Sequence, residues 1–124
     1  MRLARAAQVV DAVIDASKED VTVRMRELCP AGATKVMVSV GDAAVTETAF
    51  KYVSKGGVIN LFAGLPKEAR LSVDPFQIHY NEVKLVGSFG LAPQNFKQAI
   101  ELLATGKVNV AGIVTATVAI GEVI

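Results

Sequence analysis

Three short apolar runs, each closed by a glycine, place the tightest limit on how this chain can fold. Residues that are apolar at consecutive positions indicate strands buried on both faces, as in a parallel sheet. Segments of helical period separate these runs, and that alternation is typical of βα units. The sequence therefore predicts an α/β fold with a mostly parallel sheet flanked by helices. The three expected strands cover residues 35–40, 58–63 and 82–89.

The predicted helices begin at residues suited to a first turn. Asp20 and Asp42 are expected N-caps, and Pro93 suits the first turn of a later helix, which Gly106 would end. Shorter helical pieces are expected within 2–8 and as one turn within 67–81. The three main helices are expected over 21–29, 43–53 and 93–105, the second broken at Lys55-Gly56-Gly57.

Two further apolar segments are predicted to be strands. Residues 10–14 form a β-branched run, and residues 113–120 form a second strand-like run near the end of the chain. The helix over 21–29 could make a right-handed crossover from 10–14 to 35–40. We therefore expect 10–14 to pair with 35–40 in a four-stranded sheet, although pairing with a second chain would cover the same edge.

Composition narrows the class of protein. The chain has 124 residues, is 52% hydrophobic and carries a net charge of +1, which fits one soluble cytoplasmic domain and indicates neither a nucleic-acid partner nor a membrane partner. The single cysteine rules out an internal disulfide and a cysteine-rich metal site.

The side chains that could bind a metal, and the apolar residues at helical spacing, are expected to have structural roles. His79 is the only imidazole, and without paired ligands it is expected to be a structural or surface residue rather than a zinc ligand. Cys29 is expected to be a small buried apolar residue. Core positions at helical spacing are expected at Met25, Phe50, Phe96 and Ile100.

The glycines that end the strands admit two interpretations. In open α/β sheets, ligands bind outside the carboxyl ends of the strands, and a glycine there lets the backbone approach a ligand closely. Glycine is also common at strand-to-helix turns of any α/β fold. The pattern alone leaves both interpretations open for Gly41, Gly64, Gly87 and Gly90.

Several motifs in a fixed order resemble a known family. Residues 55–66 (KGGVINLFAGLP), 78–83 (IHYNEV) and 87–90 (GSFG) are similar to the cofactor domain of the zinc-type medium-chain dehydrogenases, with polyol dehydrogenases such as sorbitol dehydrogenase as the nearest branch. In that comparison, the segments that resemble Rossmann strands three to six are 13–15, 36–41, 58–64 and 83–89, and 2–7 resembles the helix after strand two. The implied fold is an incomplete, Rossmann-like domain with strands ordered 3-4-5-6.

The resemblance implies a function and a set of site residues. It implies descent from an enzyme that transfers hydride between a secondary alcohol or polyol and NAD or NADP, with zinc held by a separate domain. This chain would supply the nicotinamide side of the cofactor site and no catalytic or metal-binding residue. The implied cofactor contacts are Ser39, Val40, Gly41, Ala63, Gly64, Leu65, Ser88 and Phe89.

The sequence also departs from the family pattern. It contains no G-x-G-x-x-G fingerprint, which cradles the dinucleotide pyrophosphate, and none of the family's zinc-ligand domain. We therefore expect 1–124 to be one partial Rossmann domain, with about 107–124 leading toward an absent catalytic domain. By itself the chain is expected to be inactive, to bind dinucleotide weakly or not at all, and to bind no stoichiometric zinc. The substrate and the choice between NAD and NADP stay open.

The resemblance further implies an oligomer. Strand 82–89 is expected to pair across a two-fold axis with the same strand of a second copy, and Lys84 is the one charge in it that could oppose such pairing. The alternative function is a non-catalytic α/β oligomerisation or interaction module.

Overall fold

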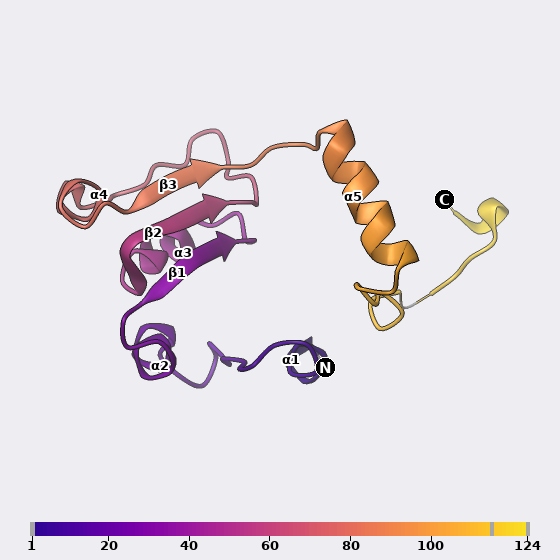
Figure 1. Cartoon of the computed structure of the whole chain (residues 1–124), viewed down its shortest axis with the longest axis horizontal. Coiled ribbons are helices and arrows are strands. Elements are labelled where there is room, and N and C mark those ends of the chain that lie inside the picture. The colour runs from indigo at the N-terminus through magenta and orange to yellow at the C-terminus, as the bar shows by residue number, and fades with distance from the viewer. Residues whose placement is uncertain (1, 115, 124) are drawn as a thin grey trace. The chain divides into compact units, whose positions relative to one another are not determined.

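The computed structural model describes residues 2–114 and 116–123. The chain forms two compact units, one made of Val10–Phe89 and the other of Met1–Val9 together with Gly90–Ile124 (Figure 1). The larger unit contains the sheet and is the one that carries the predicted cofactor contacts up to residue 89. No helix in the described part of the chain has both the length and the apolar character needed to cross a membrane.

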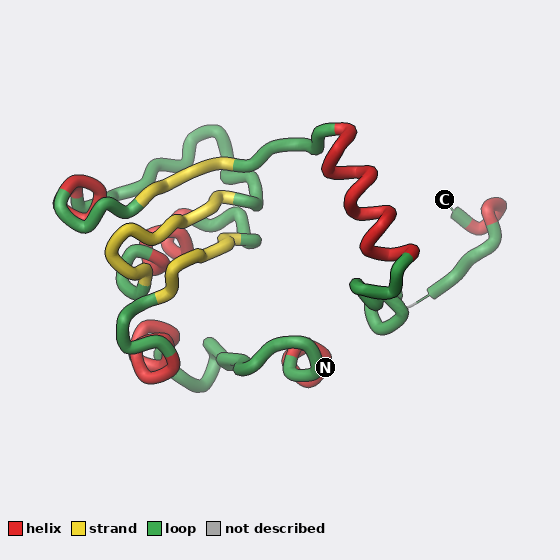
Figure 2. Tube along the Cα trace, in the orientation of Figure 1, coloured by secondary structure: helices red, strands yellow, loops and turns green. Residues whose placement is uncertain are grey.

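The larger unit is built on a three-stranded sheet. Strands β1 (Ala33–Val38), β2 (Val53–Leu61) and β3 (Lys84–Gly87), yellow in Figure 2, lie in the order β1-β2-β3. Both pairs are parallel, as the arrows of Figure 1 show. The predicted parallel α/β fold is confirmed. Each strand ends two residues before its predicted carboxyl end, so Gly41 and Gly64 lie in the loops beyond β1 and β2.

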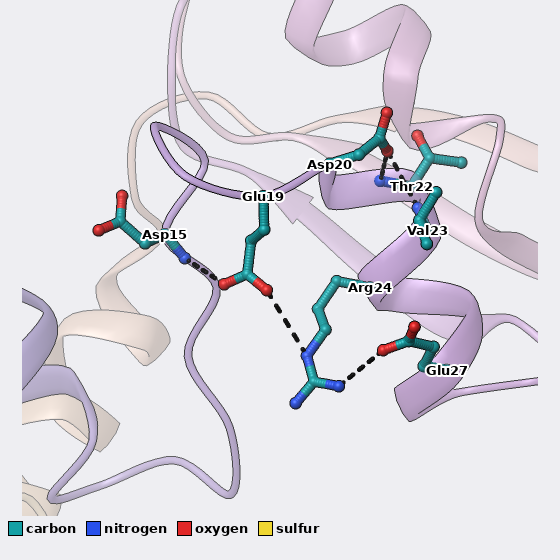
Figure 3. A network of polar contacts seen from close by, with 7 residues as sticks. All are labelled: Asp15, Glu19, Asp20, Thr22, Val23, Arg24 and Glu27. Atoms are coloured by element: carbon teal, nitrogen blue, oxygen red, sulfur yellow. Dashed lines mark hydrogen bonds and ion pairs between the residues drawn. The ribbon is translucent and has the colours of Figure 1, made fainter.

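The helices of this unit begin where capping predicted. Helix α2 (Val21–Leu28) is capped by Asp20, whose carboxylate accepts the backbone N–H groups of Thr22 at 2.7 Å and Val23 at 3.0 Å (Figure 3). Helix α3 (Ala43–Ala49) begins in the same way at Asp42. A single turn, α4 (Pro75–His79), occupies the segment expected to contain one helical turn. Local capping therefore determines where each helix starts.

Strand β2 begins earlier than predicted. Ala33 pairs with Val53 and Lys35 with Val58, so β2 bulges between these pairs. Gly56 adopts a φ of 69° in the bulge, and its N–H donates to the carbonyl of Asn81 at 2.7 Å. The prediction that Lys55-Gly56-Gly57 breaks a helix was wrong, because α3 has already ended and the glycines instead allow the strand to bulge.

The core lies between the sheet and α3. Ile59 on β2 and Ala49 on α3 are fully buried, and Val38, Phe50 and Val83 complete the cluster. The prediction that Phe50 is a core residue is confirmed. Thr46 is the one buried polar residue among those described, and its hydroxyl donates to the carbonyl of Asp42 at 3.0 Å.

The predicted strand at 10–14 was wrong. These residues form no strand, so the described sheet has three strands rather than four, and β1 has no strand on its other side. Strand propensity creates a strand only where a neighbouring edge is reached. Here the chain turns directly after the run, where Asp15 Oδ1 accepts from the backbone N–H of Ser17 at 3.1 Å and Asp15 N–H donates to Glu19 at 3.0 Å.

The second unit contains α1 (Arg2–Ala6), α5 (Pro93–Ala104) and a 3₁₀ turn over Ile120–Glu122. Pro93 starts α5, and Gly106 follows it with a φ of 68°, as predicted. The strand expected over 113–120 is absent from its described residues; position 115 lies outside them.

The helix α5 does not bury the side chains that its apolar spacing suggested. Phe96 is 57% exposed and Ile100 49% exposed, so their assignment to the core was wrong. An amphipathic helix buries its stripe only against another layer of structure. The buried apolar residues of the described chain all belong to the other unit. Met25, also predicted to be core, is partly buried on α2.

Candidate functional site

The predicted site residues follow the carboxyl ends of the three strands. Since the strands are parallel, these ends lie along one edge of the sheet, where the arrowheads in Figure 1 point. We call this the carboxyl edge. Three loops form it: residues 39–41 after β1, 63–65 after β2, and 88–89 after β3. All eight predicted contacts are therefore at this edge, although they come from segments up to 50 residues apart in the chain.

Backbone hydrogen bonds between neighbouring segments continue beyond the last residues of the strands. The N–H groups of Phe62 and Ala63 both donate to the carbonyl of Val38 at 3.0 Å, and Ser88 N–H donates to the carbonyl of Leu61 at 3.1 Å. The hydroxyl of Ser88 also donates to Asn60 Oδ1 at 3.0 Å. These bonds hold the start of two loops to the neighbouring strands. Asn60 and Phe62 were not predicted as members of this edge, although both lie within the motif 55–66.

Gly41 and Gly64 make the closest approach at the edge. A Cβ built on Gly41 would overlap the carbonyl oxygen of Gly64, whereas a Cβ on Gly64 would meet open space. Glycine is therefore required at position 41 by the close passage of two loops. This explains one of the glycines at the edge by contact between backbones rather than by a turn conformation.

The surface of the carboxyl edge is apolar and accessible. Val40 is 56% exposed, Phe62 59% exposed, and the side chain of Phe89 is fully exposed. The carboxylate nearest in sequence, Asp42, accepts the N–H of Val45 at 3.1 Å as a helix cap. The edge therefore offers apolar contacts and backbone polar groups to a ligand, and it is suited to packing against a flat ring rather than to proton transfer.

The described residues do not form a zinc site. They contain no group of three or more His, Cys, Asp or Glu side chains that could hold a metal ion. His79 is exposed and packs edge-on against Tyr80, with ring centroids 4.6 Å apart. Cys29 is also exposed, so its predicted burial was wrong: it is the C-cap of α2, a helix that buries none of its residues.

The carboxyl edge offers an apolar surface to a ligand. The close approach of Gly41 at this edge is to the carbonyl of Gly64 in the same chain. The glycine fingerprint that holds a dinucleotide pyrophosphate is not present in the sequence.

The chain is similar in sequence and in fold to several known dehydrogenases. D-arabinitol dehydrogenase 1 of Uromyces fabae is 28% identical over 118 residues, which cover 93% of this chain and 34% of that protein. An oxidoreductase/dehydrogenase of unknown specificity from Escherichia coli superposes with a TM-score of 0.81 at 28% identity, over 92% of this chain and 32% of that one. A zinc-binding dehydrogenase from Sinorhizobium meliloti 1021, described as putative and bound to NADP, gives a TM-score of 0.72 at 27% identity, over 85% and 32%.

A family model also matches most of the chain. The model described as "Zinc-binding dehydrogenase" covers residues 1–105, and this agrees with the motifs that carry the resemblance in the sequence. The chain spans about one third of the length of the curated relative it matches. By this match, the chain belongs to the zinc-binding dehydrogenase family, whose relatives include zinc-type alcohol and polyol dehydrogenases.

Proposed function

We propose that the carboxyl edge is the nicotinamide-side wall of an NAD(P)-dependent alcohol or polyol dehydrogenase. The observation that carries this proposal is the convergence of three strand ends, with Gly41 packed against the Gly64 carbonyl, in a chain of this family. D-arabinitol dehydrogenase 1 supports a polyhydroxy substrate. The alternative, a non-catalytic interaction module, is not favoured by a family match over residues 1–105.

In this proposal the residues of the chain position the cofactor. When bound, the nicotinamide accepts or donates the hydride. The loops 39–41 and 63–65 offer backbone N–H and carbonyl groups to the carboxamide, and the apolar side chains Val40 and Phe89 exclude water from one face of the ring. The contacts that recognise the alcohol and the pyrophosphate come from parts of the enzyme other than these loops.

Calorimetry with the two halves of the cofactor tests the proposal on the chain as it stands. Reduced nicotinamide mononucleotide should bind with a dissociation constant on the order of 1 mM, since a few neutral hydrogen bonds and one apolar contact supply roughly 4 kcal/mol. AMP should bind more weakly, and NADH or NADPH no more tightly than the nicotinamide half. AMP binding as tight as the nicotinamide half, or micromolar binding of a whole dinucleotide, would refute the assignment.

We also propose that β3 pairs with β3 of a second copy. β3 is the last strand in the described sheet order, and Val86 on it is 43% exposed. Ser88 N–H points toward β2, and N–H groups alternate in direction along a strand. The N–H of Gly87 therefore points to the outer edge, where it is available to a second chain. A homodimer formed through this edge would extend the sheet.

The outer N–H of Gly87 gives a selective test. Gly87→Pro removes that donor without removing a bond between β2 and β3, and Gly87→Ala is the matched control because a Cβ there meets open space. In size-exclusion chromatography with light scattering, the wild type and Gly87→Ala should be dimers and Gly87→Pro a monomer. A monomeric wild type, or a dimer that persists in Gly87→Pro, would contradict pairing through this edge.

A further inference from the structure

The larger unit contains a second cleft that shares no residue with the carboxyl edge. Its volume is about 430 Å³, which lies in the range of small-molecule sites. Helices α2, α3 and α4 and the loop before α4 contribute its lining residues. The lining also includes Phe50, which is 9% exposed and belongs to the core.

Two cations from separate elements line this cleft. Arg26 lies in the last turn of α2, and Lys51 follows α3. Neither forms an ion pair within 4.0 Å in the described residues, where the ion pairs involve Lys18 and Arg24. Their charges also reach Asp20: its pKa is lowered mainly by the N–H groups of Val23 and Thr22, and further by Lys51 and Arg26. Among the described residues, neither cation is therefore held in an ion pair, although the two carboxylates of the lining balance their charge.

The two carboxylates of the cleft are engaged with the backbone instead. Glu47 Oε1 accepts the N–H of Ser72 at 2.7 Å, and Asp74 Oδ1 accepts the N–H of Phe76 at 2.9 Å. These bonds fix both carboxylates in place. The other oxygen of each has no hydrogen bond among the described residues, so it is available to accept one from a ligand hydroxyl.

The amide of Gln77 is oriented by a neighbour. Its Oε1 accepts from Asn81 Nδ2 at 2.9 Å, which leaves the Gln77 NH₂ group as a hydrogen-bond donor in the cleft. The cleft thus combines two cations and an amide donor with two fixed carboxylate acceptors. Cations and N–H donors recognise phosphate, and carboxylate oxygens recognise hydroxyl groups.

We propose that this cleft binds the phosphate monoester of a small polyhydroxy compound. The phosphate lies between Arg26 and Lys51 and accepts from the Gln77 amide, while ligand hydroxyls donate to Glu47 and Asp74. The proposal does not depend on the cofactor wall, since the two regions share no residue.

Calorimetric titration of the full chain with glycerol 3-phosphate, inorganic phosphate and glycerol tests both parts of this recognition. Glycerol 3-phosphate should bind saturably, about tenfold more tightly than phosphate, and glycerol should give no saturable heat. Arg26→Gln and Lys51→Gln should each weaken glycerol 3-phosphate binding by about three- to tenfold. Lys55→Gln is the matched control, an exposed lysine of the same unit outside the cleft, and should leave binding unchanged.

Three outcomes would overturn the proposal. The absence of saturable glycerol 3-phosphate binding at millimolar concentration would show that the cleft is not a binding site for this class of ligand. Equal weakening in Lys55→Gln and Lys51→Gln would show nonspecific charge attraction. Equal affinity for inorganic phosphate and glycerol 3-phosphate would show that the cleft does not recognise the hydroxyl groups of the ligand. Circular dichroism of each variant separates loss of binding from loss of folding.

Discussion

Replacing Gly41 by alanine should destabilise the larger unit, because the added Cβ has no room. That Cβ would overlap the carbonyl oxygen of Gly64, a backbone atom that cannot rotate away as a side chain would. The two loops must then move apart, and overpacking of this kind typically costs about 1–3 kcal/mol. For a folding unit of the size of residues 10–89, each kcal/mol lowers the melting temperature by about 4–8 °C.

The partner glycine provides the control for this experiment. Gly64→Ala adds the same methyl group to the other glycine of this contact, but there the Cβ would meet open space. Thermal unfolding followed by circular dichroism should therefore show a melting temperature at least about 4 °C lower for Gly41→Ala, and a change for Gly64→Ala within the roughly 0.5 kcal/mol expected of a surface substitution. Equal losses in the two variants would refute the close passage of the loops.

Two further predictions concern the core and the N-cap of α2. Ile59→Ala removes a fully buried side chain at the centre of the sheet and should lower the free energy of unfolding in urea by about 2–5 kcal/mol. Phe62→Ala, at a 59% exposed position, should lower it far less. Similar losses in the two variants would contradict the assigned core. The pKa of Asp20 lies below its ordinary value of 3.8 because the N–H groups of Val23 and Thr22 donate to the carboxylate. Its stabilising effect is therefore present above pH 4 and is lost as the pH falls through the lowered pKa. Asp20→Asn keeps a capping side chain that does not titrate. Between pH 5 and pH 2, the melting temperature of this variant should therefore fall less steeply than that of the wild type. Parallel curves of melting temperature against pH would contradict the role of Asp20 as a cap.

The βα alternation could be predicted because it depends on local pattern. Runs of apolar residues, the caps Asp20 and Asp42, and Pro93 each act within a few residues of the element they determine. The strand at 10–14 could not be judged locally, because a strand also requires an edge to pair with. Likewise, the apolar stripe of α5 predicts a buried face but does not specify the layer that would bury it.

The candidate site was predictable in its positions but not in its contacts. The glycine after each apolar run marks the carboxyl edge, and the family resemblance implies which residues lie on it. The contact between Gly41 and Gly64 depends on how two loops pass in space. The hydrogen bond from Ser88 to Asn60 depends on the register of two strands that are 28 residues apart at this point. The cleft at Arg26 and Lys51 is assembled from still more distant segments, and no sequence motif marks it.

The most direct test of the cofactor wall is a nuclear magnetic resonance titration of the full chain with reduced nicotinamide mononucleotide. The account predicts that the backbone amide signals that shift belong to residues 39–41, 63–65 and 88–89, that they shift with one common dissociation constant, and that Gly41→Ala weakens this binding. Shifts confined to other parts of the chain, or no shift in the three loops at saturating ligand, would contradict it.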